Sequence, residues 1–125
     1  MTAEPRLPLR PVIEAVLEQY VLDPVEIHGV PHWARVLENG RRLAAMTGAN
    51  PKVVQLFAVL HDSRRLNEGH DPDHGQRAAE FALSLVGGLL DVSAAEAGLL
   101  AEACAGHTHL PTHPDMTIQT CWDAD

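Results

Sequence analysis

The sequence has few cysteines, no export signal and no long apolar run, and these absences narrow the class of protein. Its two cysteines form no CxxC motif, so we predict reduced thiols and no disulfide framework. The first residues contain no apolar signal-peptide region, and the longest apolar run is far too short to cross a membrane. We therefore expect a cytoplasmic protein that does not engage a membrane.

Positive charge is scarce as well. Nine Lys and Arg residues stand against 17 Asp and Glu residues, so the formal net charge is −8 with neutral histidines. This balance argues against nucleic acid as a partner, because such binding depends on many phosphate contacts. It leaves room for a small phosphorylated substrate held by a local cation. The sequence does not fix the oligomeric state, and a homodimer stays open.

Histidine, by contrast, is unusually frequent. Eight histidines, against one tyrosine and two phenylalanines, are dispersed over a chain of 125 residues. Histidine is the commonest metal ligand and a frequent acid–base group, although most dispersed histidines are expected to be loop residues. We therefore distinguish candidate metal ligands from loop histidines by their positions in the predicted helices.

An apolar run that ends in His61-Asp62 is the centre of the predicted fold. Most residues from 53 to 60 are apolar, so a helix here would belong in the protein interior. Asn50 is a suitable N-cap and Pro51 suits the first helical position, which predicts a helix from Pro51 to about Arg65. A histidine and an aspartate beside a core are costly unless they are paired or bind a metal.

Apolar periodicity and the positions of turn and capping residues predict the other helices. They span residues 11–22, 31–47, 73–86, a segment opened by the Ser93–Glu96 capping box, and 115–125. No strand alternation is present, so we predict an all-α bundle of five to six helices. It forms one domain over residues 1–125, with residues 1–10 as a surface segment.

Inward-pointing polar residues recur at or near the ends of these helices. They are His32, His61, His74, His107 and Asp125. His32, His74, His107 and Asp125 each continue the apolar stripe of their helix, and His61 ends the central apolar run. Asp123 falls on another side of the last helix and is kept as an alternative to Asp125.

These residue types predict a metal site. His61 and Asp62 are about 100° apart on a helix and can reach one ion, with His32 and an aspartate of the last helix completing four ligands. A mixed nitrogen and oxygen set suits a divalent ion (Mn, Fe, Co, Ni, Zn or Mg) without choosing among them. A second ion would need further ligands, for which His74 and His107 are the candidates, and Asp62 would then bridge the two ions.

This pattern resembles the HD superfamily of metal-dependent phosphohydrolases, and especially its small single-domain bacterial members. The matching residues are His32, then His61-Asp62, then Asp123-Ala124-Asp125, and the resemblance covers roughly residues 28–125. It implies an all-α bundle that hydrolyses a phosphate ester, often of a nucleotide, with metal-activated water. Its last ligand commonly lies in an Ala-Asp step, which corresponds to Asp125.

The resemblance also implies roles for further residues. Histidines after the HD pair serve the second ion in two-metal members, which corresponds to His74 and His107; with Asp62 orienting the attacking water, these are the predicted catalytic residues. A basic residue soon after the pair often binds phosphate, so Arg64 and Arg65 are candidates, with a solvated surface arginine as the alternative for each. The family usually continues beyond the Ala-Asp step, so we expect the C-terminal helix to be cut short at residue 125.

Several alternatives stay open. Some HD relatives hold two irons and cleave carbon bonds with dioxygen, using the same ligand types. A non-catalytic, metal-stabilised module that senses a nucleotide or binds a partner is the third function. Cys104 and Cys121 are predicted to be buried apolar residues, with a zinc site that includes His107 as the alternative. Trp33 either lines the site or packs in the core.

Overall fold

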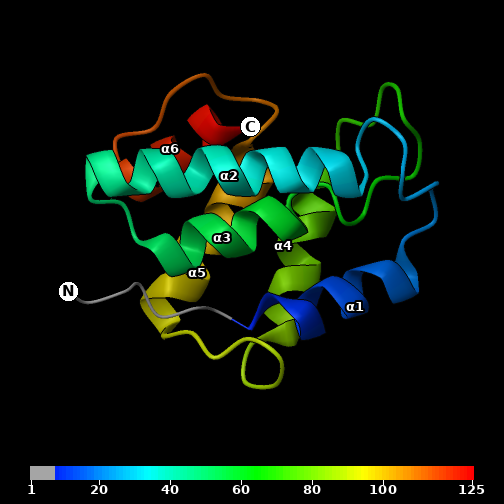
Figure 1. The fold of residues 1–125 in the computed structure, drawn as a ribbon, viewed down its shortest axis with the longest axis horizontal. Helices are drawn as coiled ribbons and strands as arrows, with labels where there is room; N and C mark the ends of the chain where they lie inside the picture. The colour runs from blue at the N-terminus through cyan, green and yellow to red at the C-terminus, as the bar shows by residue number, and fades with distance from the viewer. Residues whose placement is uncertain (1–7) are drawn as a thin grey trace.

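Six α-helices form the architecture of residues 8–125, the part of the chain that the computed structural model describes (Figure 1). They are α1 (Leu9–Gln19), α2 (Val30–Thr47), α3 (Pro51–Leu60), α4 (His74–Leu85), α5 (Ala94–Gly106) and α6 (Met116–Ala124). The predicted all-α class and the number of helices are confirmed. Residues 1–7 of the predicted surface segment lie outside the described residues, and Leu9 and Arg10 belong to α1.

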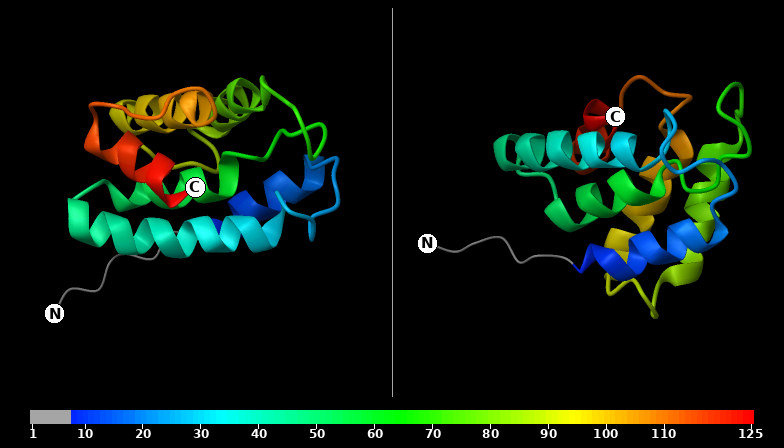
Figure 2. Two further views of the ribbon diagram at one scale, coloured as in Figure 1. Left: turned by 90° about the horizontal axis from the view of Figure 1, so that it is seen from above. Right: turned by 45° about the vertical axis from the view of Figure 1, so that its right-hand side comes forward.

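Helix α3 is the central element of this arrangement. Each of its residues from Val53 to Leu60 is buried, and it contacts all five other helices. Seen from above, α4 and α5 lie on one side and α2 on the other, with α3 and α6 between them (Figure 2). The Asn50 side chain caps α3 by accepting hydrogen bonds from the Lys52 and Val53 amides, at 3.0 and 3.3 Å. The predicted start of this helix is therefore confirmed.

The end of α3 comes earlier than predicted. The helix stops at Leu60, and the chain continues through tight turns in which Ser63 N donates to Leu60 O (3.1 Å) and Arg65 N to Asp62 O (3.4 Å). Arg65 also folds its side chain back onto Asp62, which holds the chain in these turns. As a result His61 occupies the C-cap of α3, and Asp62 lies in the turn that follows.

Helix α1 is also shifted, since it spans Leu9–Gln19 instead of 11–22. Pro11 falls in its first turn, where no backbone N–H is needed, so the helix can begin before it. Helix α5 opens with the predicted capping box, in which Ser93 and Glu96 hydrogen-bond each other's backbone amides. The last helix is capped by Asp115, which accepts from Thr117 N and Ile118 N.

Five helix ends converge because the other helices pack around α3. His32 lies in the first turn of α2, His61 caps the end of α3, His74 begins α4, His107 caps α5, and Asp125 caps α6. Glycine permits the closest of these approaches. A Cβ atom on Gly75 would lie 2.5 Å from the Cys104 carbonyl oxygen and 3.3 Å from His107 Nδ1, so only glycine lets α4 approach α5 here.

We expect the Gly75→Ala variant to be destabilised by about 1–3 kcal/mol, because the new methyl group must push α4 away from α5. The matched control is Gly98→Ala. A Cβ at Gly98 meets nothing within 4 Å, so this helical substitution should be neutral or stabilise by up to about 1 kcal/mol. Urea unfolding followed by circular dichroism measures both, and equal stability of the two variants would contradict the close-packing argument.

Candidate metal centre

One group of donor atoms gathers where α2, α3 and α6 meet. His32 Nε2 lies 3.1 Å from His61 Nε2 and 3.0 Å from Asp125 Oδ1. Asp62 Oδ2 lies 3.5 Å from His32 Nε2 and 3.4 Å from His61 Nε2. The His61 side chain is fully buried, whereas those of His32 and Asp125 are 19% and 24% exposed. This group therefore has one open edge, formed by His32 and Asp125.

A second group shares the Asp62 carboxylate. Its other oxygen, Oδ1, lies 3.0 Å from His74 Nε2 and 3.5 Å from His107 Nε2. The two histidine nitrogens are 3.0 Å apart, and both side chains are almost completely buried. Asp62 thus presents one oxygen to each group, so the predicted bridging position of this residue is where the structure places it.

The spacing of these atoms fits a divalent metal ion. Ligands at about 2.1 Å from one ion are separated by about 3.0 Å in octahedral and about 3.4 Å in tetrahedral geometry. The donor atoms of both groups lie 3.0–3.5 Å apart. Imidazole nitrogen and carboxylate oxygen are ligands that first-row divalent ions accept together. The cluster could therefore hold a metal ion, and its two groups could hold one each.

Backbone carbonyls fix the orientation of three of the imidazole rings. The Nδ1 atom of His61 donates to Phe57 O (3.0 Å), that of His74 to Asp71 O (2.6 Å), and that of His107 to Cys104 O (2.6 Å). A carbonyl oxygen can only accept, so Nδ1 carries the proton in each ring. When the ring is neutral, the Nε2 lone pair therefore faces the cluster, which is the arrangement that metal-binding histidines commonly adopt.

The electrostatics of the cluster also favour a cation. Burial opposes a charge on His61, yet the Asp62 carboxylate and a hydrogen bond to Asp125 raise the pKa of His61 to about 9. Burial likewise opposes a charge on Asp62 and Asp125, but the neighbouring histidines hold the pKa of both carboxyl groups well below its usual range. Burial lowers the pKa of His107. In this field one positive charge, from a proton or a metal ion, is strongly favoured beside two carboxylates.

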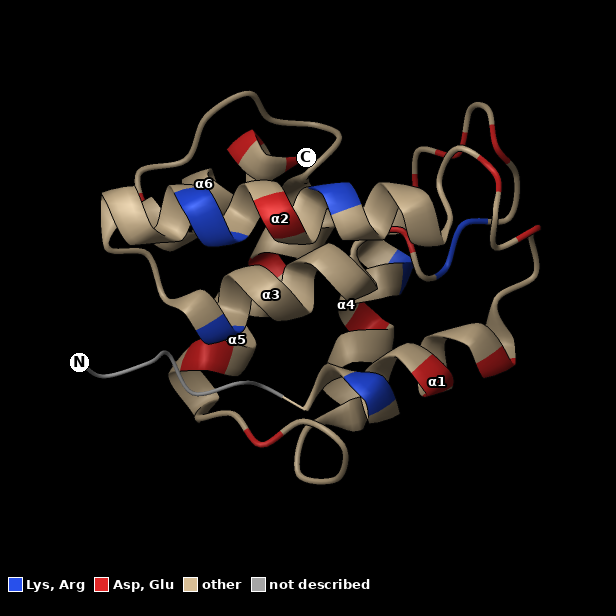
Figure 3. Ribbon diagram, viewed as in Figure 1, with Lys and Arg blue, Asp and Glu red and all other residues tan. Residues whose placement is uncertain are grey.

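Acidic residues are also frequent on two loops that adjoin the cluster. Figure 3 shows them along the two loops that join α1 to α2 and α3 to α4. These loops contain Asp23, Glu26, Glu68, Asp71 and Asp73. Their negative potential adds to the attraction of a cation, although solvent and salt screen the exposed members.

The remaining predicted site residues lie outside the two groups. Asp123 is exposed and accepts a hydrogen bond from Gln119 (2.9 Å), so the geometry selects Asp125 as the aspartate of α6. Arg64 is exposed, in agreement with the alternative prediction of a solvated surface arginine, and its guanidinium lies over the Phe81 ring. For Arg65 the alternative prediction of a solvated surface arginine is wrong. Arg65 is buried, and its Nε donates to Asp62 Oδ1 (3.3 Å).

The two cysteines are buried free thiols, as predicted. In the part of the chain from residue 8 onward, no group of donors that includes a cysteine reaches metal-binding distances. The zinc alternative for Cys104, Cys121 and His107 therefore finds no geometric support. Trp33 packs in the core, where it contacts Tyr20 edge to face and donates from Nε1 to His28 O (2.7 Å).

Sequence reasoning missed a hydrogen-bonded pair beside the first group. His28 Nδ1 lies 2.9 Å from Glu68 Oε1, and the His28 ring meets that of His32 edge to face, with centroids 6.2 Å apart. Burial, Glu68 and Asp62 raise the pKa of Tyr20 to about 12, so its hydroxyl stays protonated as it donates to His28 O. His28 and Glu68 are separated by 40 positions in the sequence, which explains why no local pattern indicated the pair.

Comparison with protein-family models, with curated proteins and with solved structures found no match for this chain. The resemblance to the HD superfamily therefore stays a prediction from the sequence motif. A membrane-spanning role finds no support among the described residues either, since none of their helices combines the length and the apolar character needed to cross a bilayer.

We expect the Asp62→Ala variant to lose metal from both groups, because each group uses one oxygen of this carboxylate. A His74→Ala variant should lose the metal of the second group and keep that of the first. Elemental analysis of protein purified without chelator measures the stoichiometry. The control is Asp123→Asn, which should bind as the parent chain does. Metal retained at the parent level by Asp62→Ala would contradict the bridging role.

Metal binding should also depend on pH through His61. A raised pKa means that the metal-free folded protein holds a proton on His61 below about pH 9, and a ligand must lose this proton to bind a metal. Apparent metal affinity should therefore rise by about tenfold per pH unit between pH 7 and 9. Calorimetric titrations at several pH values measure this dependence, and an affinity that stays constant over the range would contradict it.

The same proton stabilises the metal-free fold. Because the folded pKa of His61 lies above its unfolded value, this contribution is fully present below about pH 6.5 and is lost as the pH rises through about 9. Metal-free protein should accordingly become less stable over the range in which metal affinity increases.

Proposed function

We propose that this chain is a metal-dependent phosphohydrolase of the HD type that acts on a small phosphorylated substrate, such as a nucleotide. The observation that carries the proposal is the Asp62 carboxylate, which turns one oxygen to each of two groups of histidine nitrogens. Two ions held on either side of one carboxylate are a recurrent arrangement in enzymes that hydrolyse phosphate esters. The sequence motif supports the same reaction class.

Divalent ions in these positions would supply Lewis-acid activation of water and neutralise the negative charge of the phosphate. The chain's own residues would do the rest. His32, His61 and Asp125 would hold the first ion, and His74 and His107 the second, with Asp62 shared. The carbonyl groups that fix three of the rings keep these ligands in place without help from the substrate.

The exposure of the ligands indicates the direction of substrate approach. His74 and His107 are closed off from solvent, whereas His32 and Asp125 are the ligands that solvent reaches. A substrate would therefore arrive at the edge formed by His32 and Asp125. There, the carboxylates of Asp62 and Asp125 can accept hydrogen bonds from a water molecule and orient it toward the phosphorus atom.

A panel of nucleoside monophosphates and p-nitrophenyl phosphate tests the reaction, with the chain loaded in turn with Mn, Fe, Co, Ni, Zn or Mg. We expect phosphate release with at least one ion, and a loss of at least about 100-fold in His32→Ala and Asp62→Ala, since each removes a ligand. Asp123→Asn is the control and should keep its activity.

The other outcomes separate the competing functions. Dioxygen consumption by the iron-loaded chain, without phosphate release, would identify the protein as a diiron oxygenase instead of a hydrolase. Nucleotide binding without turnover in metal-loaded protein would identify a non-catalytic sensing module. Either result would overturn the proposed hydrolysis while leaving the metal site intact.

A further inference from the structure

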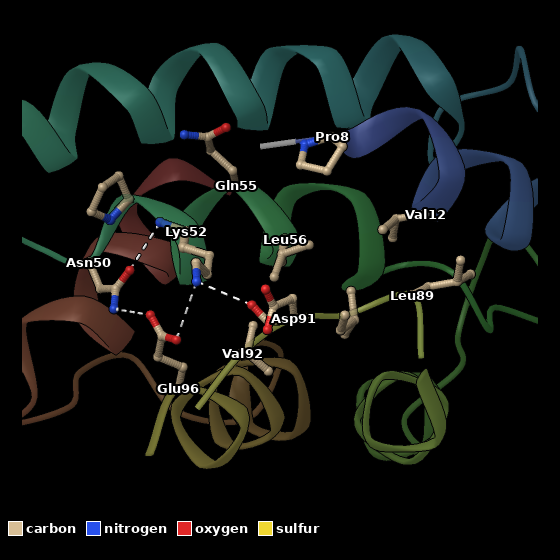
Figure 4. Close-up of a pocket in the computed structure, with 12 residues that line it drawn as sticks. Pro8, Val12, Asn50, Lys52, Gln55, Leu56, Leu89, Asp91, Val92 and Glu96 are labelled. Carbon is tan, nitrogen blue, oxygen red and sulfur yellow. Dashed lines mark hydrogen bonds and ion pairs between the residues drawn. The ribbon is translucent and has the colours of Figure 1, made fainter. Parts of the chain in front are cut away.

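A cavity lies at the N-terminal end of α3, away from the metal centre at the other end of this helix. Its volume is about 420 Å³, which is in the range of small-molecule sites. It is enclosed by the start of α1, the first turns of α3 and the loop between α4 and α5 (Figure 4). Most of its wall is apolar, formed chiefly by Pro8, Val12, Leu56, Leu89, Leu90 and Val92.

The unusual member of this wall is Gln55. It is a polar residue in the otherwise apolar buried run of α3, and it is only 3% exposed. Within residues 8–125, no group hydrogen-bonds its side-chain amide, which borders the cavity. Among the described residues the fully buried side-chain atoms without a partner are Ser63 Oγ and Glu68 Oε2, so the Gln55 amide keeps contact with the space of the cavity. An amide normally finds partners for its donor and its acceptor. A bound molecule with a matching donor and acceptor would satisfy both.

The charges at the rim decide which kind of molecule fits. Lys52 Nζ lies 3.1 Å from Asp91 O and 3.6 Å from Glu96 Oε1, so its charge is already engaged. Glu96 also accepts from Asn50 Nδ2 (2.8 Å). With Asp91 beside them, the rim carries two carboxylates and one ammonium group. Its net negative charge disfavours an anion such as a phosphate, which distinguishes this cavity from a second phosphate site.

We infer that this cavity binds an uncharged, flat small molecule with one amide-like edge, as in a lactam or a nucleobase. Gln55 would pair with that edge, because its carbonyl accepts and its NH₂ donates side by side. The apolar walls formed by Val12, Leu56 and Leu90 would cover the body of the molecule. The inference does not depend on the proposed hydrolase, because the cavity shares no lining residue with the metal centre.

Nuclear magnetic resonance of the ¹⁵N-labelled full chain tests the inference, with uracil and 2-pyridone as probes. Saturable shifts of the Gln55 side-chain amide and of the backbone around Lys52 and Leu90 are expected. Benzene, which lacks the edge, and benzoate, which is an anion, should bind more weakly by roughly tenfold or more. Absence of saturable shifts with both uracil and 2-pyridone would overturn the inference.

Two variants separate recognition by Gln55 from simple apolar filling of the cavity. Gln55→Leu keeps the volume but removes the amide, so uracil affinity should fall by roughly tenfold or more, while benzene should bind at least as well. Gln76→Leu, on an exposed position of α4, should leave both affinities unchanged. Equal uracil affinity in Gln55→Leu and the parent chain would overturn the proposal.

Discussion

The rest of the structure depends on one buried carboxylate. Asp62 has four histidine nitrogens around it, and it is almost inaccessible to solvent. A carboxylate in such a place is costly unless opposite charge and hydrogen bonds compensate for its lost hydration. Three of its five surrounding partners, His32, His74 and His107, come from other helices than the one that precedes Asp62, so the ends of these helices have to meet at this carboxylate. Arg65 adds the only guanidinium that contacts it among the described residues.

Rigid positioning of the histidines follows from the backbone of the helices. Three of the rings are held by carbonyl groups three or four residues earlier, so each ring is oriented by the last turn of a helix or by the turn that precedes one. The close approach of α4 and α5 at Gly75 then sets the separation of His74 and His107. Donor atoms held in this way would need little reorganisation to bind an ion.

Helix α3 has two chemically different ends. Its C-terminal end delivers His61 to the cluster of ionisable groups, while its N-terminal end places Gln55 against an apolar cavity. The helix between them is buried on all sides and contacts every other helix, so neither end can shift without disturbing the core. The proposed metal centre and the inferred small-molecule site thus share one rigid helix. The first consists of ionisable groups, whereas the second is mostly apolar.

The sequence alone determined the features that depend on local rules. The Asn50 cap, the Ser93–Glu96 capping box and the inward stripe that ends in Asp125 follow from residue types at fixed spacing, and the structure has each of them. The helical period likewise favoured Asp125 over Asp123 as the inward-pointing aspartate, because residues two apart on a helix point to different sides.

Only the tertiary structure decided the features that depend on the path of a loop or on contacts between distant segments. The early end of α3 and the burial of Arg65 follow from hydrogen bonds to a loop whose path the sequence does not give. The pair of His28 and Glu68 joins two loops, and the cavity beside Gln55 exists only once α1, α3 and the loop after α4 are assembled. A lone glutamine in an apolar run was the one local sign of that cavity. Local spacing fixes which face of a helix a residue occupies, whereas packing fixes what that face meets.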